Sequence, residues 1–235
     1  MNEALFIITM AFNFVGILVA YKLFGKTGLF VWIGMATVIT NLETPKTVDV
    51  IGLSVALGNV IYGSTFLCTD ILSEQYGGKE ARKGVALGFF TVIIFTILTQ
   101  VTLLYIPNSS DFADDAMHTL FSLMPRICIG SIIAYAISNT LDTYTFDWIR
   151  KRIPSHLWVR NCFSTLTSQL IDSFLFVFIA FAGLMPMQVL IELSLTTYAI
   201  KAIVAICDTP FIYIAKRIDS GRRRQYETTG LDKSV

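Results

Sequence analysis

The segment 168-SQLIDSFLFVFIAF-181 decides which class of fold this chain adopts. Most of it is apolar enough to sit in lipid, and a helix of about 20 such residues spans the hydrocarbon core of a membrane. Gln169 and Asp172 nevertheless lie inside it. A carboxylate at the centre of a bilayer costs at least about 2.5–3.5 kcal/mol. A sequence that keeps one there therefore needs a reason, either in packing or in function.

The composition of the whole chain is that of a membrane protein. Of its 235 residues, 54% are hydrophobic and 15% are charged, with a net charge of +1, whereas a soluble domain carries about 25% charged residues. Apolar stretches predict spans at 4–21, 28–42, 54–73, 85–106, 119–147, 161–183 and 188–214. We therefore predict an all-α fold, a polytopic membrane bundle of six or seven transmembrane helices. The second stretch is short enough to be a half-helix.

The distribution of Lys and Arg predicts the orientation, because cytoplasmic loops carry the excess of basic residues. One set of loops, together with the C-terminal tail, holds 15 of the 18 basic residues, and the opposite loops hold Lys46. We expect residues 1–216 to form a single transmembrane domain and 217–235 to form a polar, partly disordered cytoplasmic tail. The arginines of that tail are expected to contact anionic lipid headgroups rather than nucleic acid.

Ionisable residues inside the predicted spans are the candidates for a functional site. Such residues are rare in membranes and face the bundle interior or a water-filled cavity. The cations are Arg126 and Lys201, and the acids are Asp70, Glu74, Asp142, Asp172 and Asp208. A set of ion pairs that fixes helix packing is the alternative. Because two cations cannot neutralise five acids, we expect some of these carboxylates to serve another purpose.

Spacing groups several of these side chains on common helix faces. Gln169 lies three residues before Asp172, and Asn139 and Asp142 repeat that spacing one helix earlier. Side chains three apart share a helix face. Lys201 lies near the midpoint of the last span and Asp172 near the midpoint of the span before it. An ion pair between these two would hold both charges at the centre of the membrane.

The sequence contains no motif of an ATPase or of an intramembrane enzyme. A G-x-x-x-x-G-K-[ST] phosphate loop is absent, so nucleotide hydrolysis by that route is excluded. The glycine-rich context of intramembrane aspartyl proteases and the D-G pair of lipid phosphotransferases are absent as well. We therefore expect a transporter of a small, planar, polar molecule rather than an enzyme, with no cofactor and no metal site.

Three stretches resemble the queuosine precursor transporter family, which belongs to the vitamin uptake transporter group. They are LGNVIYGSTFLCTDILSEQYGGKEARKGVALGFF (57–90), LWVRNCFSTLTSQLIDSFLFVFIAFAG (157–183) and YAIKAIVAICDTPFIYIAKRI (198–218). Residues 1–53 resemble the family in hydropathy alone. The resemblance implies a bacterial inner-membrane protein that imports 7-deazaguanine bases for salvage into tRNA modification. These bases are 7-cyano-7-deazaguanine, 7-aminomethyl-7-deazaguanine or queuine.

The chemistry of such a base suggests a role for each candidate residue. A guanine-like edge presents N1–H and an exocyclic amine side by side, and one carboxylate can accept both. We expect Asp172 to read this edge with the help of Gln169. The other candidates for substrate contact are Asn59, Tyr62, Phe66, Asp70, Glu74, Asn139, Asp142, Lys201 and Asp208. Arg126 is expected to act as a gate or as part of a structural ion pair.

The resemblance also implies a fold similar to the substrate-binding subunits of energy-coupling-factor importers. A second hypothesis follows, in which the chain is such a vitamin-binding subunit and works only with a separate ATPase module. The expected partners are a small-molecule substrate and membrane lipids, and not nucleic acid. The preferred 7-substituent, the driving force and assembly into a homo-oligomer stay open.

Overall fold

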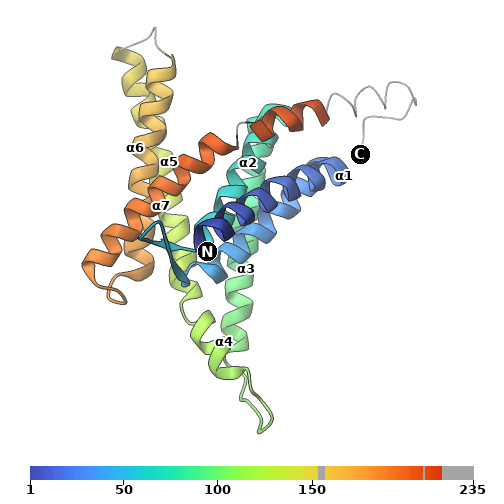
Figure 1. The fold of residues 1–235 in the computed structure, drawn as a ribbon, viewed down its shortest axis with the longest axis vertical. Coiled ribbons are helices and arrows are strands. Elements are labelled where there is room, and N and C mark those ends of the chain that lie inside the picture. Colours follow the sequence, from blue (N-terminus) through green and yellow to red (C-terminus); the bar gives the residue numbers. More distant parts are fainter. Residues whose placement is uncertain (153–156, 209, 219–235) are drawn as a thin grey trace.

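The computed structural model describes residues 1–152, 157–208 and 210–218, which are mainly helical (Figure 1). The helices are α1 (Asn2–Glu43), α2 (Gly58–Tyr76), α3 (Gly78–Thr102), α4 (Asp114–Phe121), α5 (Met124–Arg152), α6 (Leu157–Phe181) and α7 (Met187–Cys207). A further helical segment covers 210–218. Strands β1 (Thr47–Val50) and β2 (Leu53–Ala56) form an antiparallel hairpin between α1 and α2.

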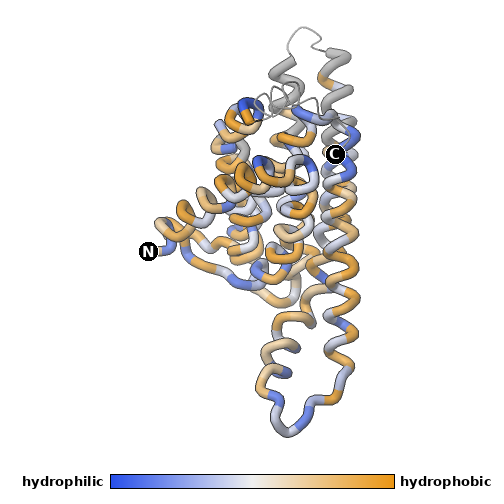
Figure 2. The backbone as a smooth tube through the Cα atoms, turned by 90° about the vertical axis from the view of Figure 1, so that its right-hand side faces the viewer, coloured by the Kyte–Doolittle hydropathy of each residue, from blue (hydrophilic) through white to orange (hydrophobic). Residues whose placement is uncertain are grey.

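The apolar helices confirm a polytopic membrane protein. The segments long and apolar enough to cross a membrane are Asn2–Glu43, Gly78–Thr102, Asp114–Leu141 and Met187–Val204, with Leu166–Phe181 as a shorter apolar helix. Hydrophobic residues run along these helices (Figure 2). Large apolar side chains such as Phe12, Phe24 and Phe90 point outward and are more than half exposed. Lipid tails are as apolar as these side chains, so the surface matches a bilayer.

Helix α1 consists of two antiparallel halves that meet at Gly25. The backbone there has φ 60° and ψ −138°, a conformation that glycine adopts far more readily than other residues. The chain reverses, and Gly16 in the first half comes to face Trp32 in the second. The two predicted segments 4–21 and 28–42 are therefore separate helices. The second half covers 26–43, about 27 Å at 1.5 Å per residue.

The β-hairpin departs from the all-α prediction. Residues 54–56 belong to β2 rather than to a membrane helix, and α2 begins at Gly58. The stretch from Thr47 to Ala56 is rich in β-branched residues, which favour strands. The predicted span 119–147 is also interrupted, because α4 ends at Phe121 and α5 begins at Met124.

The turn of this hairpin contains an unusual backbone conformation. Ile51 has φ 53° and Gly52 has φ 74°, and a two-residue type I′ turn requires positive φ at both positions. Glycine adopts this region freely, whereas a β-branched isoleucine rarely does. The Ile51 N–H donates to Glu3 Oε1 at 3.2 Å, and Asn2 Nδ2 donates to the Asp49 carbonyl at 2.8 Å. The start of α1 therefore holds the turn in place.

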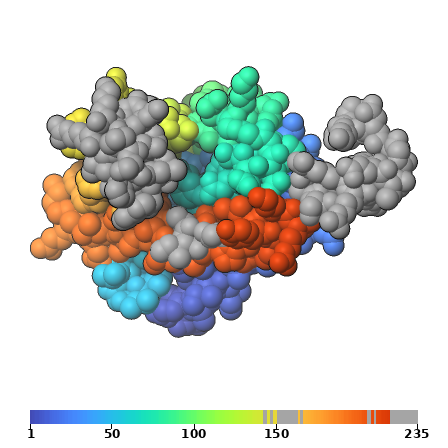
Figure 3. Space-filling model, turned by 90° about the horizontal axis from the view of Figure 1, so that it is seen from above, coloured from blue at the N-terminus to red at the C-terminus, as the bar shows by residue number. Residues whose placement is uncertain are grey.

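Polar contacts gather the predicted cytoplasmic segments at one end of the bundle. The reversal in α1, the α2–α3 turn and the segment 210–218 are joined by the ion pairs Lys26–Glu80 (3.3 Å) and Lys216–Glu74 (3.0 Å). The view onto this end shows α2 and the 210–218 segment side by side (Figure 3). The hairpin instead contacts the starts of α1 and α7 at the opposite end. The part of the predicted tail that follows residue 218 lies outside the described residues.

Two apolar clusters flank the centre of the bundle. The first packs α1 against α2 and α7 through side chains that include Ile17, Leu67 and Ile200. The second packs α5 against α6 and α7 and includes Ile127 and Val177. Helix α7 belongs to both clusters. Polar side chains between the clusters are therefore kept away from lipid.

We expect the α2–α3 turn to face the cytoplasm and the loop between α3 and α4 to face outward, because basic residues are retained inside. In a variant without native cysteines, Ser110→Cys should react with a membrane-impermeant maleimide in intact cells. Lys79→Cys is the matched control, since both positions are exposed, and should react only after permeabilisation. The reverse labelling pattern would show that the orientation is wrong.

The hairpin turn predicts a stabilising substitution. Ile51→Asn creates Asn-Gly, which adopts a type I′ turn with less strain, so the temperature of thermal unfolding in detergent should rise, by the equivalent of about 1 kcal/mol. Leu53→Asn makes the same chemical change at an exposed position without positive φ and should not stabilise. Equal effects of the two substitutions would remove backbone strain as the cause.

Candidate functional site

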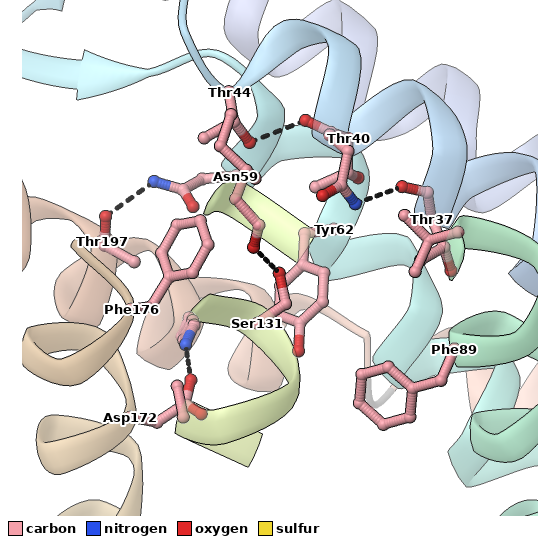
Figure 4. Close-up of a pocket in the computed structure, with 15 residues that line it drawn as sticks. Thr37, Thr40, Thr44, Asn59, Tyr62, Phe89, Ser131, Asp172, Phe176 and Thr197 are labelled. Carbon is pink, nitrogen blue, oxygen red and sulfur yellow. Dashed lines mark hydrogen bonds and ion pairs between the residues drawn. The ribbon is translucent and has the colours of Figure 1, made fainter. Parts of the chain in front are cut away.

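A cavity lies between the two apolar clusters, and α1, α2, α3, α5, α6 and α7 all contribute to its wall (Figure 4). The polar side chains that line it are Thr37, Thr40, Asn41, Thr44, Asn59, Tyr62, Ser131, Asp172, Thr197 and Lys201. Helical spacing explains the grouping, because residues three or four apart share a face. Asn59 and Tyr62 are such a pair in α2, as are Thr197 and Lys201 in α7.

An ion pair between Asp172 and Lys201 dominates the electrostatics of the cavity. The Lys201 ammonium donates to Asp172 Oδ2, and the Ser138 hydroxyl donates to Oδ1 at 3.1 Å. Both Asp172 and Lys201 are only 7% exposed. This contact confirms the pairing that their positions near the middle of adjacent spans predicted. Each charge offsets part of the cost of burying the other, and removing either would leave an uncompensated buried charge.

Aromatic rings supply the flat apolar part of the wall. Tyr62, Phe89 and Phe176 line the cavity, and Lys201 Nζ lies 5.5 Å from the centre of the Tyr62 ring, within range of a cation–π interaction. The predicted residue Phe66 packs edge-on against Tyr62 with ring centres 5.2 Å apart. Phe66 therefore supports a ring of the wall from behind. Phe89 and Phe176 were missed because isolated phenylalanines are common in any membrane helix.

The second half of α1 carries a polar face that sequence reasoning missed. Thr37, Thr40, Asn41 and Thr44 all line the cavity. Thr44 Oγ1 donates to the Thr40 carbonyl at 2.7 Å, and Asn41 Nδ2 donates to the Thr37 carbonyl at 2.7 Å. The spacing T-x-x-T-N-x-x-T within an apolar helix is the signal that would have found this face, because it repeats every turn.

Asn59 is a predicted site residue that both lines the cavity and joins two helices. Its Nδ2 donates to Thr197 Oγ1 at 2.8 Å, which connects the start of α2 to α7. Just before it, Gly58 lies so close to α1 that an added Cβ would fall 2.6 Å from Thr44 Oγ1. The cavity wall therefore reaches the helix ends that flank the hairpin.

Two other predicted residues lie near Asp172 but outside the cavity wall. Gln169 is three residues before Asp172 on α6, and its buried Oε1 has no hydrogen-bond partner among the described residues. Asn139 is exposed and follows Ser138, which takes the contact with Asp172 instead. The side chain of Asp142 lies outside the described part of the structure.

The other predicted acids do not reach the cavity. Glu74 pairs with Lys216 at 3.0 Å, at the end of the bundle away from the hairpin. Asp70 follows Tyr62 by eight residues on α2, about 12 Å along the axis at 1.5 Å per residue. Asp208 is buried at the C-terminal end of α7. The helical rise thus separates these carboxylates from Asp172, although all lie in or next to apolar runs.

Arg126 contacts backbone carbonyls rather than a carboxylate. Its Nε donates to the Ile179 carbonyl at 2.7 Å, and its Nη2 donates to the Ala182 carbonyl. The last carbonyls of a helix have no partner within that helix, so Arg126 satisfies the end of α6 from the start of α5. Arg126 does not line the cavity. Arg126 therefore joins the start of α5 to the end of α6 through hydrogen bonds to the backbone, and not through the predicted ion pair.

Within the described residues, no group of three or more His, Cys, Asp or Glu side chains could hold a metal ion. The cavity offers one ammonium, one carboxylate, two side-chain amides, several hydroxyls and aromatic faces. These groups are suited to hydrogen bonding a planar polar ligand, because such a ligand needs both edge partners and a flat surface.

Comparison with known proteins places the chain among transporters. The family described as "Putative vitamin uptake transporter" matches residues 56–215. A "Probable queuosine precursor transporter" of Bacillus subtilis (strain 168) is 45% identical over 219 residues, covering 92% of this chain and 96% of the relative. The "Queuosine precursor transporter" of Escherichia coli (strain K12) is 27% identical over 173 residues, or 71% and 75% of the two chains.

A third relative is a "Probable queuosine precursor transporter" of Haemophilus influenzae, 29% identical over 125 residues, or 53% of this chain and 51% of the relative. No solved structure matches the chain. The family match covers every helix that lines the cavity except α1. The match with the Bacillus relative covers nearly the whole sequence. The chain therefore belongs to the vitamin uptake transporter family, together with proteins named as queuosine precursor transporters.

Proposed function

We propose that this protein imports queuosine precursors, 7-deazaguanine bases, across the bacterial inner membrane, and that it binds them in the central cavity. The names of its relatives support the class of substrate. The observation that carries the proposal is the buried Asp172–Lys201 pair in an aromatic-lined cavity. Ionisable residues within membranes mark substrate or ion pathways, and this pair lies where six helices meet.

The paired charges match the hydrogen-bonding edge of a guanine-like base. That edge presents the O6 acceptor, the N1–H donor and the 2-amine donor in a row. Lys201 offers donors alone, and an ionised Asp172 offers acceptors alone. A base that enters edge-on can therefore place O6 against the ammonium while N1–H and the amine face the carboxylate. The match uses groups that lie side by side in the cavity.

The same pair explains why a carboxylate is retained inside the membrane. Asp172 is paired with Lys201 and receives a hydrogen bond from Ser138. With substrate, each charged group exchanges part of this contact for a polar atom of the base, so neither becomes unpaired. Charged hydrogen bonds are the strong ones, worth about 1.5–3 kcal/mol each. Tyr62 and Phe176 provide faces on which the ring can stack.

A panel of bases tests the proposal directly. The purified chain in proteoliposomes should take up 7-deazaguanines, and a matched base without the 2-amine should bind at least about tenfold more weakly, because one charged hydrogen bond is lost. 7-Deazaadenine should fail, since its 6-amine would face Lys201. Liposomes without protein are the control. Equal binding of all three bases would overturn the edge-reading role, and binding without uptake would favour the subunit of an energy-coupling-factor importer.

Asp172→Asn should weaken binding about tenfold to a hundredfold, because an amide replaces one acceptor oxygen with a donor that faces the substrate. The substitution also leaves Lys201 unpaired, which can cost about 3–5 kcal/mol of folding stability. Equilibrium binding and thermal unfolding should therefore be measured together.

The double variant Asp172→Asn/Lys201→Met separates binding from folding. It removes both charges, so thermal stability should return towards that of the wild type, since replacing a whole buried pair is often neutral. Binding should stay lost. A double variant that is stable and binds 7-deazaguanine as tightly as the wild type would show that the pair serves packing alone.

A further inference from the structure

The wall formed by α1 contains two buried polar atoms without a partner. Thr40 Oγ1 and Asn41 Oδ1 make no hydrogen bond in the described structure, although the two residues are only 8% and 3% exposed. Burying such atoms without a partner is unfavourable, so native proteins contain few of them. Both residues line the central cavity. A ligand in the cavity is therefore the available partner for these atoms.

The surrounding hydrogen bonds fix what this wall can offer. Asn41 Nδ2 donates to the Thr37 carbonyl at 2.7 Å, which needs the amide nitrogen on that side and leaves the oxygen free as an acceptor. The neighbouring hydroxyls are already used, because Thr37 donates to the Ile33 carbonyl at 2.6 Å and Thr44 donates to the Thr40 carbonyl at 2.7 Å. Thr40 and Asn41 are thus the two members of this face with unused polar atoms.

We infer that Thr40 and Asn41 form a second subsite, the α1 subsite, which accepts hydrogen bonds from a donor on the 7-substituent of the base. This inference rests on the proposed function. An aminomethyl substituent is an ammonium at neutral pH and carries three donors, whereas a nitrile carries an acceptor alone. A nitrile offers no donor, so Asn41 Oδ1 would stay unpartnered beside a cyano base, which is unfavourable for a buried acceptor. The α1 subsite therefore selects the aminomethyl base over the cyano base.

The layout of the cavity agrees with this assignment. The close-up shows Asp172 on one side of the cavity and Thr40 on the other, with the Tyr62 ring between them (Figure 4). The 7-substituent extends from the five-membered ring on the side of O6, roughly opposite the 2-amine. A base whose 2-amine contacts Asp172 consequently directs its substituent towards the other side of the cavity, where α1 lies (Figure 4).

Equilibrium binding of three ligands tests the α1 subsite: 7-deazaguanine, its 7-aminomethyl derivative and its 7-cyano derivative. In the wild type, the aminomethyl base should bind most tightly. Asn41→Leu, which keeps the volume and removes the acceptor, should lower affinity for the aminomethyl base about tenfold or more. Its affinity for the other two bases should change less than about threefold. Thr40→Val should act in the same direction, and it tests the subsite if Asn41→Leu does not fold.

Thr44→Val is the matched control, because Thr44 lines the same face but its hydroxyl already donates to a carbonyl. It should leave the ratio of aminomethyl to cyano affinity unchanged. An unchanged ratio in Asn41→Leu and Thr40→Val would overturn the α1 subsite. An equal loss for all three bases would place their common pyrrole N–H against α1 and overturn the assignment to the substituent. Failure of the wild type to bind any of the bases would instead overturn the proposed function.

Discussion

The buried ion pair between Asp172 and Lys201 is the constraint on which the arrangement of the bundle depends. Two charges in the middle of a membrane are tolerated when they contact each other and are screened from lipid. Helices α6 and α7 must therefore keep a fixed register. Ser138 from α5 and Tyr62 from α2 complete the surroundings of the pair. The remaining helices seal this polar centre within the two apolar clusters that meet at α7.

Several parts of this arrangement could be predicted from the sequence. Asp172 and Lys201 were predicted as a pair because each charge stands alone near the midpoint of an apolar run, and the cost of burial requires a nearby partner. The segments 4–21 and 28–42 were predicted as separate spans because the short stretch between them carries Lys22 and Lys26. Local patterns of hydropathy and charge therefore predict where most of the membrane helices lie in the sequence.

Other parts depend on contacts that single-sequence patterns do not reveal. The polar face of α1 was missed because threonine in a helix often bonds its own backbone, so its role depends on which side meets the cavity. Asp70 and Asp208 were assigned to the site because ionisable residues inside apolar runs are candidates for function. The helical rise instead places them at the other end of the bundle. The hairpin was missed because its apolar residues join the run that continues into α2.

The neutrality of the Asp172–Lys201 pair has an electrical consequence for the proposed transport. Since the two charges cancel, a cycle that moves an uncharged base past them without a coupled ion transfers no net charge. An ammonium-bearing base carries one positive charge. Moving that charge across a membrane potential of 100 mV changes its free energy by about 2.3 kcal/mol. A voltage that is negative inside would therefore draw the aminomethyl base into the cell and leave the cyano base unaffected. The same binding site would then let the cell concentrate the aminomethyl base, while the cyano base would reach equal concentrations on the two sides of the membrane.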